Sequence, residues 1–122
     1  MIKDAGDIID RLAICQLKAI RINNPTCKRE FREYLDELFV LFMQYPEICW
    51  WKFIREAVLV NDAIWELESA VRQGKLDNDS KEVGKRAIEI RNWNKKRIDI
   101  KNQINALTGE GFIEGKTDHL SE

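Results

Sequence analysis

The chain has 122 residues, of which 44% are apolar and 34% are charged, a balance that fits one folded domain with a single hydrophobic core and excludes a disordered chain. Twenty basic residues against 21 acidic ones give a formal net charge of −1, which excludes a global field that would attract nucleic acid or an anionic membrane. No apolar run approaches the roughly 20 residues of a membrane span, and the N-terminus lacks the apolar segment of a secretion signal. We therefore expect a cytoplasmic protein, of a bacterium or of an infected host cell, with no nucleic-acid or membrane partner.

The first two predicted helices are separated by a short asparagine-rich break. Asp7 and Asp10 favour a helix start, and the following residues predict a helix over 8–22 that ends at Asn23 and Asn24. Asn24 followed by Pro25 is a strong start signal for a second helix. Its apolar residues recur at helical spacing as far as Pro46, namely Phe31, Leu35, Leu38, Phe42 and Tyr45.

The next two helices are long and are joined by a short polar loop. Pro46 predicts the start of a helix over about 46–73, which Gly74 ends, and Asp79 with Glu82 resembles a capping box for a helix over about 80–108. So short a connection makes the pair an antiparallel hairpin. The expected fold is all-α, a four-helix bundle-like domain over 1–109, followed by a flexible or docked C-terminal tail over 110–122.

Polar residues lie on faces of these two helices that otherwise look like core. Projection at about 100° per residue places Asn61, Glu68 and Arg72 beside the apolar seam of the 46–73 helix, close to Trp65. On the 80–108 helix the same projection places five polar residues inside the apolar arc: Arg86, Asn94, Arg97, Lys101 and Asn105. Antiparallel register then predicts that Glu68 lies near Arg86 and Asn61 near Asn94. The predicted helix over 8–22 could add Asp10, Lys18 and Arg21 to this polar set.

Positive charge dominates this predicted polar ladder. Glu68 and Asp10 stand against five cations: Arg72, Arg86, Arg97, Lys101 and Lys18. A buried ion must be paired or must contact a ligand, because an isolated ion in a dry interior is far too costly. The sequence therefore predicts a groove with excess positive charge.

Three segments resemble one family: GDIIDRLAICQLKAIRI, NDAIWELESAVR and NWNKKRIDIKNQIN, followed by FIEGKT. The chain is similar to small uncharacterised all-helical bacterial proteins found near surface-polysaccharide and glycosyltransferase genes. The resemblance implies a helical fold and a polar site, but no reaction. Its matching positions are Asp10, Lys18, Arg21, Asn61, Trp65, Glu68, Arg72, Asn94, Arg97, Lys101 and Asn105, with Glu114 and Lys116 in the tail; Gly115 departs from the acidic residue expected there.

The first functional hypothesis is non-catalytic binding, including sequestration, of an anionic small molecule such as a nucleotide, a cyclic nucleotide signal or a sugar nucleotide. Arginine and lysine would hold phosphate, asparagine amides would bind hydroxyl or base edges, and Trp65 or Trp93 could stack on a ring. The expected ligand-binding residues are Lys18, Asn61, Trp65, Glu68, Arg72, Asn94, Arg97, Lys101 and Asn105. We expect no cofactor, no metal and no catalytic residue.

Two alternatives stay open. One is an enzyme or accessory factor that acts on nucleotides or nucleotide sugars in glycan biosynthesis. The residues favour binding over catalysis, because the acidic group Glu30, Glu33, Asp36 and Glu37 lacks an acidic partner on a facing helix, and the only histidine, His119, lies in the tail. The other is a structural homo-oligomer with a buried polar network, formed through the region of Trp50, Trp51 and Phe53. Cys15, Cys27 and Cys49 have no disulfide or zinc spacing and are expected to be buried free thiols.

Overall fold

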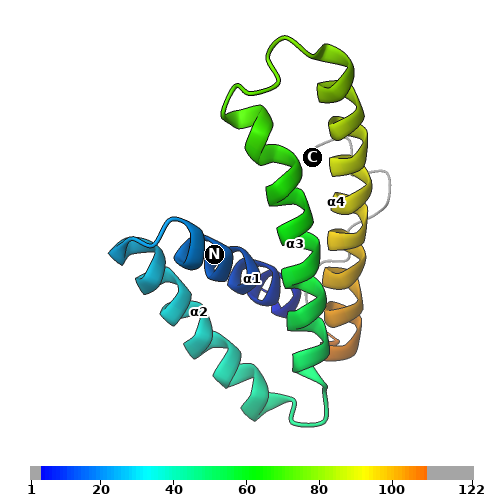
Figure 1. Cartoon of the computed structure of the whole chain (residues 1–122). Coiled ribbons are helices and arrows are strands. Elements are labelled where there is room, and N and C mark those ends of the chain that lie inside the picture. Colours follow the sequence, from blue (N-terminus) through cyan, green and yellow to red (C-terminus); the bar gives the residue numbers. More distant parts are fainter. Residues whose placement is uncertain (1–3, 110–122) are drawn as a thin grey trace.

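The computed structural model describes residues 4–109, which fold into four helices and contain no strand. The helices are α1 (Ala5–Arg21), α2 (Pro25–Gln44), α3 (Trp50–Arg72) and α4 (Ser80–Thr108), as Figure 1 shows. The all-α prediction and the predicted hairpin of two long helices are confirmed. None of the helices in this part of the chain is both long and apolar enough to cross a membrane.

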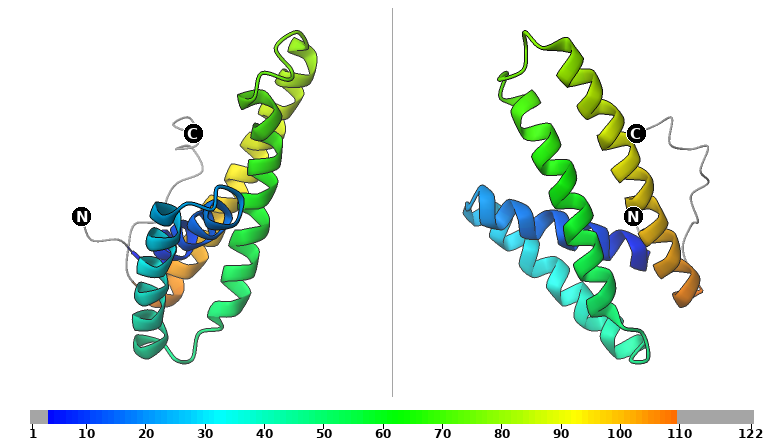
Figure 2. Two further views of the ribbon diagram at one scale, coloured as in Figure 1. Left: turned by 60° about the vertical axis from the view of Figure 1, so that its left-hand side comes forward. Right: turned by 45° about the vertical axis from the view of Figure 1, so that its right-hand side comes forward.

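The helices form two antiparallel pairs that cross. α1 packs against each of the other three helices, whereas α2 packs mainly on α1. Figure 2 shows the α1–α2 pair lying against one side of the α3–α4 hairpin, near its open end, while the loop end of the hairpin projects beyond it. The core lies where α1 meets α3 and α4, and its largest fully buried side chains are Trp50, Ile9, Leu12 and Ile104. α1 is therefore the helix that can bring side chains into the core face of the hairpin.

The ends of α2 and α4 follow the local signals in the sequence. Asn24 caps α2 by accepting the Cys27 N–H at 2.8 Å, and Asp79 caps α4 by accepting the Glu82 N–H at 3.0 Å. α4 ends at Gly109, whose φ of 68° is a left-handed conformation that favours glycine. These three predictions are confirmed.

The predicted starts of α1 and α3 are wrong. α1 begins one turn earlier than expected, with Asp4 and not Asp7 as the cap; Asp4 accepts the Asp7 N–H at 2.8 Å. α3 begins at Trp50 and not at Pro46, because the chain turns first and buries Trp50, which is 1% exposed. The Trp50 indole N–H donates to the Tyr45 carbonyl at 3.1 Å and holds this turn closed. At α3 a tertiary contact outweighs the local start signal, whereas at α1 another local cap, Asp4, takes the place of the expected one.

Gly6 brings the first turn of α1 into direct contact with α4. Its N–H donates to the Asn105 side-chain oxygen at 2.9 Å, and a Cβ at Gly6 would lie only 2.7 Å from the Lys101 carbonyl oxygen. Any larger residue would have to separate the two helices. This close approach sets the position from which Asp7 and Asp10 reach α4.

Candidate ligand-binding site

A buried carboxylate joins three helices at the centre of the predicted polar ladder. Asp10 of α1 is 4% exposed and accepts from Arg97 of α4, whose Nε and Nη2 lie 2.9 Å from its two oxygens. The Asn61 amide of α3 donates to the same carboxylate at 3.1 Å and also to the Ala57 carbonyl at 2.9 Å. A two-point contact between a guanidinium and a carboxylate, here called a fork, is among the strongest ion pairs in proteins. Together with the Asn61 hydrogen bond, it fixes the relative positions of α1, α3 and α4.

A cleft of about 350 Å³ lies beside this cluster, between the same three helices. One part of its wall is apolar and consists of Ile14 and Leu17 of α1 with Ile64 and Trp65 of α3. The rest is polar and is lined by Lys18, Asn61, Glu68, Arg72, Asn94 and Arg97. The cleft therefore combines a surface for a ring with groups that can bind charge and hydrogen-bonding edges.

Seven of the nine residues predicted to bind a ligand line this cleft, and two lie elsewhere. Lys101 forms an ion pair with Asp7 at 3.0 Å. Asn105, which is 2% exposed, accepts the Gly6 N–H and serves the contact between α1 and α4. Both of these residues face the first turn of α1, because α4 continues past the cleft toward the open end of the hairpin.

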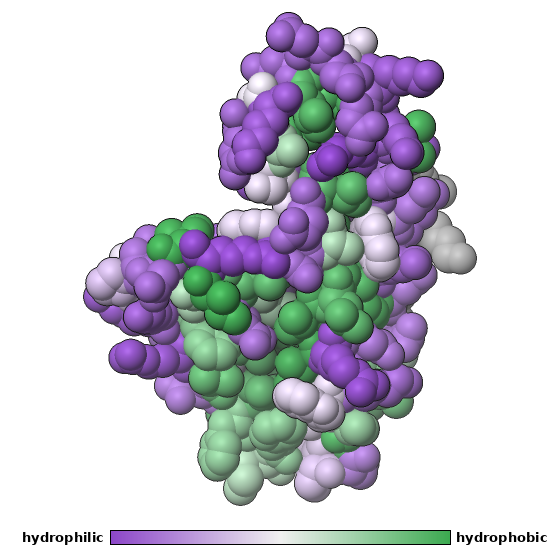
Figure 3. Space-filling model, viewed as in Figure 1, coloured by the Kyte–Doolittle hydropathy of each residue, from purple (hydrophilic) through white to green (hydrophobic). Residues whose placement is uncertain are grey.

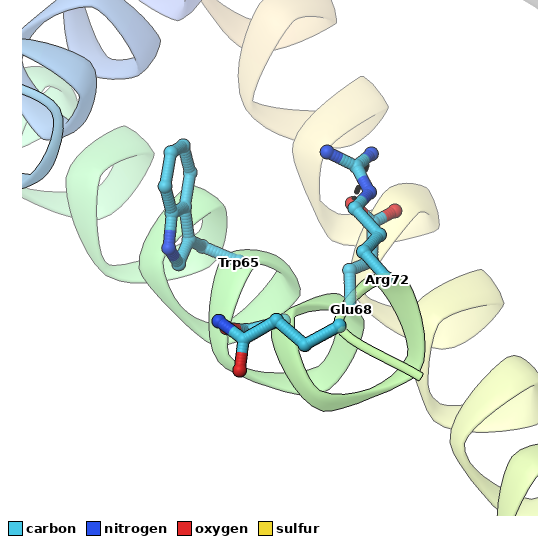
Figure 4. Close-up of a pocket in the computed structure, with 5 residues that line it drawn as sticks. Trp65, Glu68 and Arg72 are labelled. Carbon is cyan, nitrogen blue, oxygen red and sulfur yellow. Dashed lines mark hydrogen bonds and ion pairs between the residues drawn. The ribbon is translucent and has the colours of Figure 1, made fainter. Parts of the chain in front are cut away.

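The expected partners on the hairpin are only partly correct. Arg86 reaches the turn next to Glu68, where it donates to the Leu67 carbonyl at 3.3 Å, but its ion-pair partner is Glu82 at 3.1 Å. Glu68 pairs instead with Arg72, one turn along α3, at 2.7 Å. Figure 4 shows these two side chains joined by their ion pair, with the Trp65 indole projecting from the neighbouring turn of α3. The register of α3 against α4 is close to the predicted one, but Glu68 and Arg86 each form an ion pair within their own helix.

Asn61 and Asn94 both line the cleft but make their hydrogen bonds with different groups. Asn61 donates to Asp10 and to the backbone of its own helix. The Asn94 side-chain oxygen accepts from Arg97 at 3.5 Å, which is a weak contact. The two amides therefore line the same cleft.

Arg21 holds one wall of the cleft in place. Its guanidinium forms ion pairs with Asp62 and, at 3.1 Å, with Glu66, and it lies 5.4 Å from the centroid of the Trp65 ring. These contacts join the last turn of α1 to the middle of α3. Trp65 is thus positioned by a cation–π contact. Trp93, the other tryptophan considered for stacking, does not line the cleft; the Lys96 ammonium lies 4.3 Å from its ring centroid.

The excess of positive charge is smaller than the sequence suggests. Asp7 and Glu82, which lie outside the predicted set, neutralise Lys101 and Arg86, while Asp10 and Glu68 neutralise Arg97 and Arg72. Within residues 4–109, Lys18 is the cation of the predicted set that forms no ion pair. The cleft therefore keeps at most one surplus positive charge, on Lys18, because Asp62 and Glu66 share the single cation Arg21 at the neighbouring wall.

Sequence reasoning missed the role of Gly6 and Asp7. A usable signal existed, because Asp7, Asp10, Ile14, Lys18 and Arg21 are spaced three or four residues apart, as on a single helix face. That face is the one that α1 turns toward α3 and α4. Including Asp7 in the ladder would have supplied the partner of Lys101.

The remaining predictions concern aromatic, acidic and cysteine residues. Trp50 and Phe53 are buried in the core, at 1% and 5% exposure, whereas Trp51 is 68% exposed. No group of three or more histidine, cysteine, aspartate or glutamate side chains within the described residues could hold a metal ion, so the acidic group on α2 forms no such site there. The tail residues Phe112, Ile113, Glu114, Lys116 and His119 lie outside the described residues.

All three cysteines are free thiols. Cys15 and Cys27 are buried as expected, whereas Cys49 is exposed, so the prediction of a buried thiol is wrong there. Burial raises the pKa of Cys15, and the nearby Glu30 carboxylate, 3.8 Å from the sulfur, raises the pKa further. A thiol in this state is a poor nucleophile. Cys15 is therefore a structural residue beneath α2.

No protein-family model matches the chain, and neither a curated protein nor a solved structure gives a match. The resemblance to the helical proteins associated with surface-polysaccharide genes therefore stays a prediction. The function must therefore be inferred from the geometry and charge of the cleft.

Proposed function

We propose that the cleft between α1, α3 and α4 binds an anionic small molecule, such as a nucleotide, a cyclic nucleotide signal or a sugar nucleotide, without transforming it. The observation that carries the proposal is the position of Lys18. This lysine lines the cleft, is partly buried and makes no ion pair within the described residues. A partly desolvated ammonium that lacks a carboxylate partner gains most from an anionic ligand.

The other groups of the cleft suit the organic part of such a ligand. Trp65 and Ile64 offer an apolar surface for a ring, and Asn61 and Asn94 offer amide groups for hydroxyls or base edges. Arg97 and Asn61 are already held by Asp10, so these groups need little reordering when a ligand binds. Binding without chemistry would allow the protein to sequester its ligand. We place this function in the cytoplasm, a reducing compartment in which free thiols persist.

A thermal-shift panel tests this proposal on the full chain, with nucleotides, cyclic nucleotides and sugar nucleotides, each with and without Mg²⁺. A ligand at 100 times its Kd should stabilise the fold by about 2.7 kcal/mol. Lys18→Gln should reduce this stabilisation by about half, because a roughly tenfold weaker Kd leaves the ligand at about ten times Kd. Lys95→Gln is the matched control, because Lys95 is exposed and does not line the cleft. If no anionic compound changes the melting temperature, the proposal is wrong; product formation during incubation would favour the enzyme alternative.

A second proposal, self-association, is favoured by the apolar surface near the α2–α3 turn. Four large apolar residues of the C-terminal half of α2 are 42–71% exposed, namely Phe39, Val40, Phe42 and Met43, and Trp51 at the start of α3 is 68% exposed. Figure 3 shows apolar surface gathered over the lower part of the molecule, where α2 ends. We propose that this surface contacts a second copy of the chain, with Trp51 as the member of the Trp50, Trp51 and Phe53 group that takes part.

Sedimentation equilibrium tests self-association directly. The parent chain should form a dimer or larger assembly, and Met43→Glu combined with Trp51→Ser should shift the equilibrium toward the monomer. Ile88→Glu is a control, since Ile88 is 53% exposed in the half of α4 nearer the α3–α4 loop, away from the α2–α3 turn (Figure 1). If the parent chain is monomeric at high concentration, the proposal of self-association is wrong.

A further inference from the structure

The charge balance of the cleft limits how many phosphates a ligand can bring. Three cations, Lys18, Arg72 and Arg97, line the cleft together with one anion, Glu68. Arg72 is paired with Glu68 at 2.7 Å, and Arg97 forms its fork with Asp10 directly behind the lining. Beside the Trp65 wall, two carboxylates, Asp62 and Glu66, share the single cation Arg21. The surplus positive charge in and around the cleft is therefore at most one, and Lys18 carries it.

Glu68 strengthens this limit. Its side chain is 30% exposed and lies in the cleft wall, so a phosphate that displaces Arg72 from Glu68 would uncover a carboxylate next to itself. Two like charges at such a distance repel, and the repulsion is stronger in a partly buried cleft than in water. Additional phosphates would meet this carboxylate without a free cation to balance them.

The size of the cleft points the same way. Its volume of about 350 Å³ is at the lower end of the range for small-molecule sites, which is about 300–1,000 Å³. The apolar wall formed by Ile14, Leu17, Ile64 and Trp65 offers one surface for one ring. Lys18 lies one turn before Arg21, the residue whose guanidinium contacts Trp65, so the unpaired ammonium lies near that surface.

We infer that the ligand of this cleft carries one phosphate and one ring system, as a nucleoside monophosphate does, and not several phosphates or two nucleosides. The inference rests on the proposed anion-binding function and narrows it. The phosphate contacts Lys18, the ring lies against Trp65 and Ile64, and the amides of Asn61 and Asn94 contact polar edges. Nucleoside triphosphates, cyclic dinucleotides and sugar nucleotides with a diphosphate bring two or more phosphates, and so more negative charge than the cleft can balance.

Isothermal titration calorimetry on the full chain tests the inference. The probes are AMP, GMP, CMP and UMP, their nucleosides and triphosphates, cyclic di-AMP, cyclic di-GMP and UDP-glucose. One monophosphate should bind at least roughly tenfold more tightly than its nucleoside and its triphosphate, the factor expected for one hydrogen bond to a charged group. Lys18→Gln should weaken the binding of that monophosphate by about the same factor, and Lys18→Arg should restore most of the affinity. Lys95→Gln should leave the affinity unchanged.

The outcomes separate the inference from the function on which it rests. If a triphosphate, a cyclic dinucleotide or a sugar nucleotide binds as tightly as any monophosphate, the cleft binds anions but the inference of one phosphate is wrong. Equal affinity for nucleoside and monophosphate also overturns it, since Lys18 would then not contact phosphate. If none of the probes binds, both the inference and the proposed function fail. Circular dichroism of each variant checks that a loss of binding is not a loss of fold.

Discussion

The Asp10 carboxylate accepts from the Arg97 guanidinium through a two-point contact, with Nε and Nη2 each 2.9 Å from one of its oxygens. The two residues are 87 positions apart, so the pair joins the first helix of the chain to the last. Asp10 is 4% exposed, whereas the Arg97 side chain is 30% exposed. The carboxylate is thus the buried partner, and the arginine connects it to the cleft.

Asp10→Asn should destabilise the fold by about 3 kcal/mol, near the low end of the range for breaking a buried ion pair, because Arg97 still reaches solvent. The amide keeps the shape of the side chain but replaces one acceptor with a donor that faces a cation. Urea unfolding followed by circular dichroism measures the change. Asp7→Asn is the control, since Asp7 pairs with Lys101 at 3.0 Å but is 40% exposed, and should lose less than about 1 kcal/mol. Equal losses in the two variants would contradict the assignment of Asp10 as the buried centre.

Gly6 and Gly84 should respond in opposite ways to alanine. Gly6→Ala places a Cβ 2.7 Å from the Lys101 carbonyl oxygen, so the α1–α4 contact must open, at a cost of about 1–3 kcal/mol. Gly84 lies within α4 with no atom inside 4 Å of an added Cβ, and Gly84→Ala should stabilise the fold by about 0.5–1 kcal/mol through helix propensity. Thermal unfolding of both variants measures the difference in sign. A stable Gly6→Ala variant would show that α1 and α4 do not approach so closely.

The parts of the fold that sequence predicts well are those set by local chemistry. Asn24, Asp79 and Gly109 act within one turn of the helix end that they define, so their effect can be recognised without knowing the tertiary structure. Pro46 gives an equally good local signal, but the start of α3 is set by the burial of Trp50, a contact with distant residues. Tertiary packing of this kind cannot be deduced from the spacing of nearby residues.

The polar face was predictable, whereas its partners were not. Helical projection places Asn61, Glu68, Arg97 and their neighbours on the correct sides of α3 and α4, because periodicity determines direction. It does not determine rotamers, so Glu68 pairs within its own helix with Arg72 and not with Arg86. The binding role of the residues that line the cleft remains a prediction.

Asp79→Ala should destabilise the start of α4 by about 1 kcal/mol, because it removes the acceptor of the Glu82 N–H at 3.0 Å. The loss should be local, since the loop end of the hairpin projects beyond α1 and α2 (Figure 1). Hydrogen exchange measured by NMR should show faster exchange over the first turns of α4 and unchanged exchange at Ile104. Asp99→Ala, an exposed acidic position in the interior of the same helix, controls for the loss of one negative charge. Uniformly faster exchange along the whole chain would mean that the cap stabilises more than its own helix end.

Cys15 should react with iodoacetamide far more slowly than Cys49. Cys15 is 4% exposed and Cys49 is exposed, and the raised pKa of Cys15 keeps its thiol protonated, while alkylation requires the thiolate. Peptide-level mass spectrometry on the folded chain should give a rate ratio of roughly tenfold or more. The ratio should approach unity in denaturant. Fast labelling of Cys15 under native conditions would show that α2 separates readily from α1.

The same thiol should make the fold sensitive to alkaline pH. The pKa of Cys15 is raised in the folded chain from an ordinary value of 9.0, so the unfolded chain releases this proton at a lower pH than the folded chain does. The contribution of Cys15 to the free energy of unfolding is therefore fully present below about pH 9 and is lost as the pH rises through the folded-state pKa. Urea unfolding at about pH 8 and about pH 10 should show a smaller loss of stability in Cys15→Ala than in the parent chain, because alanine removes this titration. Cys49→Ala should lose as much stability as the parent, and an equal loss in Cys15→Ala would show that other groups account for the alkaline effect.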